Sequence, residues 1–452
     1  MKSSVKFNDD NVLARFYGRS ANYTDIPNQL FAEYNVKKGL RNDDGTGVRI
    51  GLTRVSDVVG YEKDEETGEI RPIDGDLLYR GYSIKDLVAN RQGNFGYEET
   101  CFLLLFGYLP SREEFSLFKN SLSARYDLPE HFLMTDLLGS QTTNLMNKLM
   151  TMTLALYNYD SNPDTVDVYQ TLIKGISLIA RFPVIGCYSY HAKVHHYYRQ
   201  SLIIHYPRHE YSIAENILYM LRADGKFSNR EANLLDAMLV IHADHGGGNN
   251  STFTNVVMGS TGTDLYSAVS GSIGSLKGPK HGGANISVNQ MMRQIIAEID
   301  YTTDRDKIRP IVEKLMDGDY YDHTGLIYGF GHAVYTITDP RAELLRGLCK
   351  DLAAEKGCLH KYAFYRAFED TVREMVTERR GKPIPTNVDF YSGFAYDMLG
   401  IPEDLFTPLF AIARVGGWVA HNIENKLYDG KIMRPATKYV GTCNKFIPIR
   451  KR

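Results

Sequence analysis

The sequence lacks an excess of charge of either sign: 52 lysines and arginines stand against 54 aspartates and glutamates, for a net charge of -2. A protein that binds nucleic acid mainly through the phosphates needs a basic face, and this composition does not force one. The sequence also lacks an apolar run that approaches the ~20 residues of a membrane span. The longest run, Cys101–Phe106, is broken by Gly107. We therefore expect neither nucleic acid nor a membrane as a partner.

Cysteine is scarce, and its five copies are scattered, odd in number and never arranged as CxxC. This pattern favours neither a disulfide framework nor a zinc ribbon. The phosphate-binding signatures GxGxxG and GxxxxGKS/T are absent, as is strand–helix alternation, so a doubly wound nucleotide-binding fold has no support. The first ten residues contain no apolar segment for secretion and carry Asp9 and Asp10, which a mitochondrial presequence would avoid. We therefore expect a cytoplasmic protein.

The patterns that are present predict a mostly helical protein, and its 452 residues predict two packed domains. Apolar residues recur at helix spacing over 288–299 and imply one buried face. Two Ser-x-x-Glu sequences, at 111–114 and 228–231, are typical of capping boxes at the start of amphipathic helices. Only the stretch 47–81, with alternating apolar residues and an acidic turn at 64–68, predicts a small β-hairpin region.

Two glycine-rich segments present histidines. In the first, 241–250, a helix ends in three glycines. His242 and His245 fall short of the HExxH metal motif, and a solvated helix end is the structural alternative. In the second, 278–285, His281 lies just before a predicted helix, whose dipole would lower its pKa. A neutral imidazole there can donate to an oxygen that gains charge as a carbonyl becomes an enolate, although such a histidine, taken alone, would usually be structural.

Two further segments offer a carboxylate-binding group and a base. The third, 329–335, places His332 among glycines and an aromatic ring, and Arg341 follows with a planar fork that suits a carboxylate. The fourth, 387–393, places Asp389 among apolar and aromatic neighbours. An aspartate partly removed from water becomes a stronger base, whereas a helix cap or a turn is its structural alternative.

Taken together, these segments resemble the active-site segments of the citrate synthase family, in the family's order and at its approximate spacings. The likeness covers most of the chain, from about residue 40 to about residue 440. It implies an all-α, mainly helical two-domain fold. The large domain would comprise 1–283 and 395–452, with the role of 1–45 open, and the small domain would be inserted at 284–394. The sequences that carry the likeness are HADHGGGN, GPKHGGAN, GFGHAVYTITDPR, NVDFYSG and the tail ARVGGWVAHNIE followed by MRP.

The resemblance implies an enzyme that condenses acetyl-CoA with oxaloacetate and water to give citrate and CoA. This is the reaction that opens the tricarboxylic acid cycle, and it would need no cofactor and no metal. Asp389 would remove a proton from the acetyl methyl group while His281 donates to the thioester oxygen. His332 would polarise and then protonate the ketone oxygen of oxaloacetate, so that a general base and oxygen-stabilising donors act together.

The resemblance also implies how the substrates are held. Oxaloacetate would be bound by His245, His332, Arg341, Arg414 and Arg434, all of which but His332 would hold its carboxylates. Arg434 would be supplied by the neighbouring subunit of a homodimer. CoA would be bound by Ile327, Tyr328, Gly329, Phe330, Gly331 and Lys382. One position departs from the family's pattern: Thr336 stands where a basic residue is usual. We therefore expect a weaker or differently placed hold on CoA.

Three alternatives remain open from the sequence. 2-Methylcitrate synthase shares the catalytic residues and differs in accepting propionyl-CoA, and one methylene is worth only ~1–3 kcal/mol of discrimination in a pocket. A catalytically silent helical dimer that binds CoA or dicarboxylates and a metal hydrolase are the other two. The presence of His281, His332 and Asp389 together favours an active condensing enzyme.

Overall fold

The structure is a computed structural model. It describes residues 9–64, 66–428 and 430–451. The chain divides into two compact units, Met1–Ile50 with Met433–Arg452, and Gly51–Ile432. The domain boundaries predicted at 284 and 394 stay a prediction. Residues 1–8, on which the expectation of a cytoplasmic protein partly rests, and residue 65 of the predicted acidic turn lie outside the described residues.

The smaller unit is mainly helix and extended chain. Its helices are α1 (Asp9–Thr24) and α2 (Gln29–Glu33), with 3-10 turns η1 (Lys38–Leu40) and η5 (Ile449–Lys451). Arg434 lies in this unit, in an extended segment, and its side chain is exposed.

The larger unit is mostly helical, which confirms the predicted all-α class. Three short strands form its sheet, β1 (Ser56–Lys63), β2 (Ile70–Tyr79) and β3 (Tyr82–Ser83). The helices are α3 (Ile84–Ala89), α4 (Gly96–Phe106), α5 (Arg112–Ser123), α6 (Leu145–Ala155), α7 (Val168–Tyr198), α8 (Ile213–Leu221), α9 (Asn229–His242), α10 (Asn250–Gly259), α11 (Leu265–Leu276), α12 (Ala284–Ile299), α13 (Arg305–Asp317), α14 (Pro340–Glu355), α15 (Leu359–Arg380), α16 (Val388–Leu399) and α17 (Phe406–Leu427). Short turns of helix are η2 (Leu133–Leu137), η3 (Leu156–Tyr159) and η4 (Glu403–Leu405).

The local signals read from the sequence are confirmed at helix starts and in the sheet. Ser111 and Ser228 each accept a hydrogen bond from the backbone N–H of the glutamate three residues on, and each glutamate accepts in return. The stretch predicted as a β-hairpin contains β1 and β2, which pair antiparallel, with β3 added beside β2. The apolar face predicted over 288–299 lies on α12, where Val288 and Ile295 are buried.

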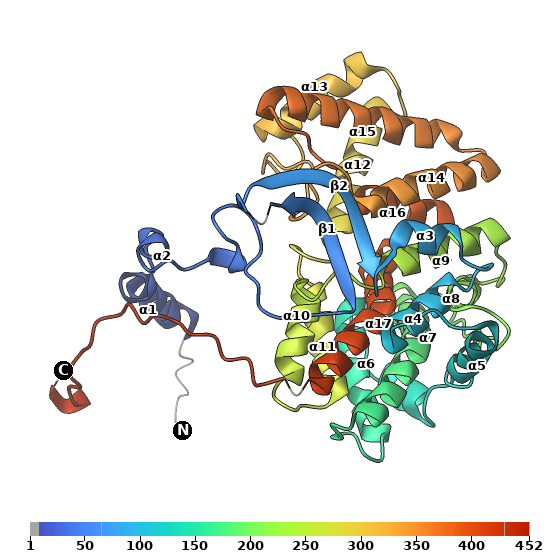
Figure 1. Ribbon diagram of the computed structural model, residues 1–452, viewed down its shortest axis with the longest axis horizontal. Coiled ribbons are helices and arrows are strands. Elements are labelled where there is room, and N and C mark those ends of the chain that lie inside the picture. Colours follow the sequence, from blue (N-terminus) through green and yellow to red (C-terminus); the bar gives the residue numbers. More distant parts are fainter. Residues whose placement is uncertain (1–8, 65, 429, 452) are drawn as a thin grey trace, which may run out of the picture. The chain divides into compact units, whose positions relative to one another are not determined.

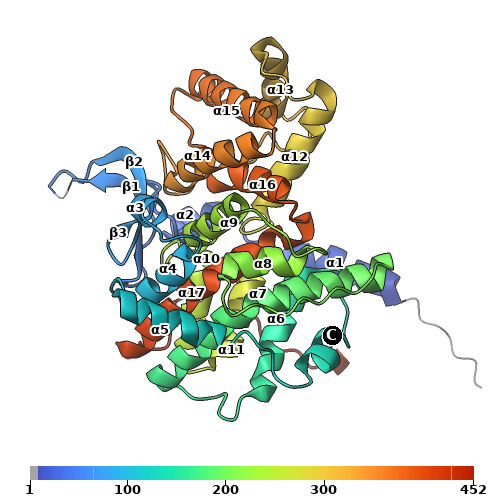
Figure 2. The same cartoon turned by 90° about the vertical axis from the view of Figure 1, so that its right-hand side faces the viewer.

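Helix α17 lies at the centre of the larger unit. It packs against α4, α7, α9, α10 and α11, as the two ribbon views show (Figure 1, Figure 2). Nearly all of its side chains from Phe406 to Ile423 are buried, including Trp418 and the charged Arg414. Because α17 crosses the core, it can present polar groups to an enclosed site.

Helix α7 was not anticipated from the sequence. Its 31 residues are, by length and composition, apolar enough to cross a membrane, although most of its apolar stretch is buried inside the structure, as in the core helix of a soluble protein. Lys174 and Arg181 interrupt the apolar residues of α7, so the sequence contains no long uninterrupted apolar run there that would indicate this helix.

Helices α12 to α16 form a group of their own within the larger unit. Helix α16 packs against α12 and α14, and α13 packs against α15; Figure 1 shows the group at the top of the view. The group meets the remaining helices where α14 and α16 contact α9 and where α12 contacts α17. The segments singled out in the sequence meet at this junction.

Candidate active site

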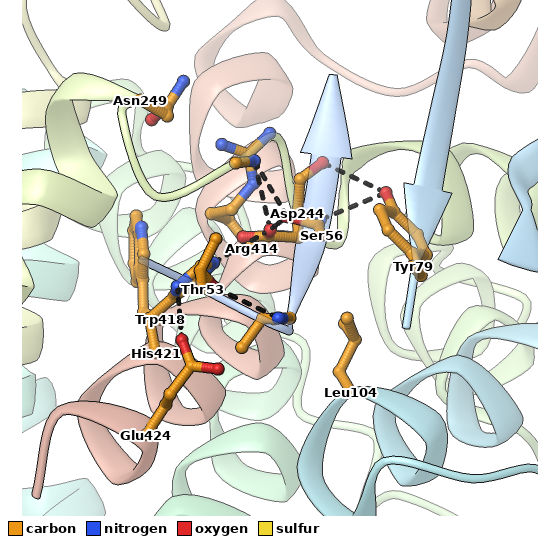
Figure 3. A network of polar contacts seen from close by, with 12 residues as sticks. Thr53, Ser56, Tyr79, Leu104, Asp244, Asn249, Arg414, Trp418, His421 and Glu424 are labelled. Atoms are coloured by element: carbon orange, nitrogen blue, oxygen red, sulfur yellow. Dashed lines mark hydrogen bonds and ion pairs between the residues drawn. The ribbon is translucent and has the colours of Figure 1, made fainter. Parts of the chain in front are cut away.

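The turn after α9 is fixed by a buried aspartate. The Asp244 carboxylate accepts hydrogen bonds from the Ser56 hydroxyl and from Nε2 of His421, the latter at 3.1 Å (Figure 3). It also accepts from the backbone N–H of Gly246 at 3.1 Å. Tyr79 on β2 donates to the Asp244 carbonyl at 3.1 Å. Burial acts to raise the pKa of Asp244, but His421 and the charge of Arg414 hold it below the usual value. Groups from β1, β2 and α17 thus hold the turn that carries His245.

Arg414 on α17 presents two buried, unused donor groups. Its Nε donates to the carbonyl of His242 at 2.6 Å, and the guanidinium lies 4.8 Å from the ring centroid of Phe410. Neither Nη1 nor Nη2 has a hydrogen-bond partner among the residues that the structure describes. Burial lowers the pKa of Arg414 to about 10, so it stays charged near neutral pH. Buried donors are nearly always paired in proteins, and two Nη groups match the two oxygens of a carboxylate.

Two histidines lie beside each other near this arginine. The rings of His245 and His332 are 5.3 Å apart and almost perpendicular. Burial, and then the charges of Arg341 and Arg414, lower the pKa of His245 well below its usual value. Its buried Nε2 has no partner within the described part of the chain. His245 is therefore a neutral side chain with a polar atom left for a ligand.

His332 is held in one tautomer by the backbone that follows it. Its Nδ1 accepts hydrogen bonds from the N–H groups of Val334 at 3.1 Å and Tyr335 at 3.0 Å. Since Nδ1 accepts, the proton of the neutral ring lies on Nε2. Nε2–H is the group that can donate to a substrate oxygen.

Arg341 is buried near these histidines, but one edge of its fork is already used. Nε donates to Asp339 Oδ1 at 3.0 Å, and Nη2 donates to Oδ2 at 2.8 Å. Asp339 is also the N-cap of α14 and accepts from the backbone N–H of Arg341. The sequence predicted a fork open to a carboxylate, whereas the structure leaves only the Nη1 side to face one.

His281 lies in the turn between α11 and α12. Its Nε2 is 3.1 Å from Asn249 Oδ1 and 3.2 Å from the hydroxyl of Ser251, which also accepts from the indole N–H of Trp418. Burial and then the charge of Arg414 lower its pKa to about 4, so the ring is neutral. The sequence predicted this direction from the helix dipole, but burial is the larger cause. Asn249 Oδ1 can only accept, and the Ser251 hydroxyl donates its own proton to that oxygen at 2.9 Å, so these contacts place the ring proton on Nε2. The ring proton lies on Nδ1 only when the Ser251 hydroxyl turns to donate to Nε2.

Asp389 lies in the first turn of α16, after the N-cap Asn387. Its side chain is partly buried. Burial raises its pKa to about 6; the charge of Arg341 opposes this shift, and that of Asp339 adds to it. A carboxylate with a pKa near 6 is ionised at neutral pH and is a stronger base than an ordinary aspartate.

This pKa predicts the acid side of the pH–rate profile. If Asp389 is the essential base, kcat/KM for the thioester substrate is flat near pH 8 and falls about tenfold per pH unit below about pH 6, because the base becomes protonated. His281 adds no step in this range, since its pKa lies near 4. Steady-state rates between about pH 4.5 and 8 check this expectation. A profile that stays flat to pH 4.5 would contradict it.

The predicted CoA loop is tied to the segment that precedes Asp389. Gly331 donates its N–H to the carbonyl of Pro385 at 2.8 Å, and Asn387 donates to the carbonyl of Gly329 at 2.9 Å. Gly329 has φ of +89°, and a Cβ there would lie 2.9 Å from the Cβ of Phe390. The loop that runs through Ile327, Tyr328 and Phe330 is therefore fixed beside α16. Lys382 lies exposed at the turn that leads into this segment.

The structure thus brings most of the predicted residues into one region. The rings of His245 and His332 are in contact, the charge of Arg414 acts on His245 and His281, and the charge of Arg341 acts on His245 and Asp389. Arg434 belongs to the other compact unit. The sequence analysis did not single out several residues that hold the site, among them Ser56, Asp339 and Phe410. Of these, only Asp339 carried a signal, as an N-cap aspartate before proline.

Within the described residues, no group of three or more histidine, cysteine, aspartate or glutamate side chains could hold a metal ion. What the site does contain is a charged arginine with unused donors, three histidines and a carboxyl group with a raised pKa. With the mostly helical fold, these features define an acid–base enzyme for a small anionic substrate.

The comparisons with known proteins identify the family. Residues 44–436 match the family described as citrate synthase, C-terminal domain. Citrate synthase of Haloferax volcanii is 36% identical over 390 residues, 84% of this chain and 94% of that protein. 2-Methylcitrate synthase 1 of Corynebacterium glutamicum is 32% identical over 411 residues, 90% of this chain and 98% of that protein. The chain belongs to the citrate synthase family.

A solved structure extends the likeness to the fold. The ternary complex of citrate synthase from Thermoplasma acidophilum with carboxymethyl coenzyme A and oxaloacetate superposes with a TM-score of 0.73 at 26% identity. The match covers 92% of this chain and 99% of that chain. Both the family and its fold are thus established for this chain.

Proposed function

We propose that this enzyme condenses acetyl-CoA with oxaloacetate and water, giving citrate and CoA, the reaction that opens the tricarboxylic acid cycle. The observation that carries the proposal is the buried Arg414, whose two Nη groups lack partners among the described residues, in the same region as a carboxyl group of raised pKa. A carboxylate of a dicarboxylic acid pairs with the Nη groups of Arg414. The carboxyl group of raised pKa removes a proton from a weakly acidic methyl group.

The chemistry follows from the protonation states. Asp389 takes a proton from the acetyl methyl group, and the electron pair of that C–H bond moves toward the thioester oxygen. His281 donates to this oxygen from Nδ1, in the tautomer that forms when the Ser251 hydroxyl turns from Asn249 Oδ1 to His281 Nε2. A neutral donor stabilises the enolate oxygen without adding a positive charge that the buried site would have to solvate. These two groups lower the cost of forming a carbon nucleophile.

The second substrate is the electrophile. Arg414 and His245 bind a carboxylate of oxaloacetate, and the Nη1 side of Arg341 faces another. His332 donates from Nε2 to the ketone oxygen while the new carbon–carbon bond forms, and it transfers that proton to give the hydroxyl of citryl-CoA. Water then attacks the thioester carbonyl, the C–S bond breaks, and citrate and CoA leave.

The test of this function is a comparison of two acyl donors. Thiol release with oxaloacetate is expected to be about 10- to 200-fold more efficient, in kcat/KM, with acetyl-CoA than with propionyl-CoA, the range that one methylene gives in a fitted pocket. The relative from Corynebacterium glutamicum makes the second donor the pertinent rival. A preference for propionyl-CoA would make the enzyme a 2-methylcitrate synthase. Thiol release from neither donor would leave a silent binding protein.

We also propose that the active form is a homodimer and that Arg434 of the partner subunit completes the oxaloacetate site. Large apolar side chains are exposed along the surface near α6 and the start of α7, as a buried interface requires. They are Met134, Leu154, Val166 and Tyr169.

Shared sites predict complementation between two inactive variants. Arg434→Ala and Asp389→Asn are each expected to be nearly inactive. After unfolding and refolding together, half of the dimers are mixed, and each mixed dimer has one complete site, so about a quarter of the wild-type activity returns. Refolding each variant alone is the control. No recovery in a mixture that forms dimers would place Arg434 outside the partner's site.

A further inference from the structure

Tyr335 lies at the centre of three side chains of the site. Its ring stacks on that of His332, with centroids 4.5 Å apart and planes 27° apart. The ring of His245 meets it nearly edge-on at 5.8 Å, and the Arg341 guanidinium lies 5.8 Å from its centroid. The side chain is almost completely buried. None of the steps of the proposed reaction involves Tyr335.

The same residue also contributes a backbone group. The N–H of Tyr335, with that of Val334, donates to His332 Nδ1. An imidazole has a broad χ2 preference, so two hydrogen bonds to one nitrogen leave the ring free to tilt. A flat ring stacked on its face removes that freedom. The ring and the backbone of Tyr335 thus restrain different motions of His332.

The β1–β2 hairpin supports the other side of Tyr335. At Gly75 of β2, an added Cβ would lie 2.7 Å from Tyr335 Cδ1 and 2.1 Å from the carbonyl oxygen of Thr338. The Gly75 N–H donates to the Thr338 hydroxyl at 3.0 Å, and the Tyr335 hydroxyl donates to the Asp76 carbonyl at 3.4 Å. The absence of a side chain at Gly75 lets the hairpin lie directly against the ring.

We propose that Tyr335 is a positioning residue for His332: its ring, held between the hairpin and the imidazole, keeps Nδ1 on the two backbone N–H groups and Nε2–H directed at the substrate ketone. The assignment of that ketone rests on the function proposed above. The flat face of the ring carries the effect, and the hydroxyl, with one long hydrogen bond, contributes little.

The test compares substitutions that keep or remove the flat face. Tyr335→Phe is expected to keep kcat within about twofold of wild type. Tyr335→Leu, which keeps an apolar side chain without a flat face, is expected to lower kcat about 10- to 100-fold, as misplaced catalytic groups do, with KM for oxaloacetate changed far less. Tyr188→Leu, at an equally buried tyrosine of α7, is the control for lost core packing and should leave kcat unchanged. If Tyr335→Leu does not fold, Tyr335→Met takes its place, since methionine adapts to irregular gaps.

Nitrogen NMR of histidine-labelled enzyme gives a readout that does not depend on turnover. The His332 signal, assigned by its loss in His332→Gln, should report the Nε2–H tautomer in wild type and Tyr335→Phe, and exchange between tautomers in Tyr335→Leu. Unchanged tautomer and kcat in Tyr335→Leu, or equal losses in the Phe and Leu variants, would overturn the proposal. Because the tautomer is measured directly, failure of the proposed reaction would not be mistaken for failure of the positioning role.

Discussion

Asp389→Asn is expected to lower kcat by about 10²- to 10⁴-fold, the usual contribution of a positioned general base. The affinity for oxaloacetate should stay within about twofold, because the groups that bind its carboxylates are unchanged and the variant removes only the group that takes the methyl proton. Turnover measured by thiol release and oxaloacetate binding measured by calorimetry separate the two effects. Asp397→Asn, which makes the same change on the same helix beside Arg293, is the matched control and should retain turnover.

The same variant has an expected effect on stability. The folded-state pKa of Asp389 is raised to about 6, above the value of 3.8 for an unperturbed aspartate. Protonated Asp389 therefore favours folding at low pH, and this contribution is lost as pH rises toward and through about 6. At pH 7, Asp389→Asn should unfold at a higher temperature than wild type, and at pH 4 the difference should shrink.

Full turnover in Asp389→Asn, or a loss of oxaloacetate affinity as large as the loss of kcat, would refute the role of Asp389 as the base.

Arg414→Met is expected to weaken oxaloacetate binding by about 30- to several thousand-fold. Removing one partner of a buried charge pair costs about 2–5 kcal/mol, and both unused Nη groups are lost in this variant. Arg414→Lys keeps the charge but lacks the planar fork, so it should show a smaller loss, still of about tenfold or more. Calorimetric titration of each variant with oxaloacetate gives the dissociation constants directly.

The control for this experiment is a change of the same chemistry outside the site. Arg293→Met removes a guanidinium that lies on α12, pairs with Glu403 and is more than half exposed, and it should leave oxaloacetate affinity unchanged. If Arg414→Met binds oxaloacetate as tightly as wild type, the unused donors of Arg414 serve some other ligand. If Arg414→Lys matches wild type, charge alone holds the carboxylate and the fork geometry is irrelevant.

Local signals in the sequence were sufficient to predict much of the fold. Capping boxes at 111–114 and 228–231 and the apolar period over 288–299 depend on residues within a few positions of one another, and the structure has them as predicted. The β-hairpin region was visible for the same reason. Helix α7 was missed because its apolar residues face several neighbours and are interrupted by charges, so its burial depends on tertiary packing.

The candidate site was predicted less completely, because its side chains are partnered across long separations. The environment of Asp389 could be read from its apolar neighbours, and its raised pKa agrees. The pairing of Arg341 with Asp339 could not be predicted, because the sequence does not show whether a guanidinium is free or already paired. The hydrogen bond between Ser56 on β1 and Asp244 in the turn after α9 could not be predicted either, because the two residues are 188 positions apart in the sequence. The sequence therefore indicates which groups can react, and the fold determines which of them already have hydrogen-bond partners within the protein.

The most direct test of the account is a crystal structure of the enzyme with oxaloacetate and a non-reactive analogue of acetyl-CoA. The acyl group of the analogue should contact Asp389 on its methyl side and His281 on its oxygen, each within about 2.6–3.2 Å between heavy atoms, with His332 at the ketone and Arg414 on a carboxylate. An acyl group bound out of reach of Asp389, or oxaloacetate bound away from Arg414, would contradict the account.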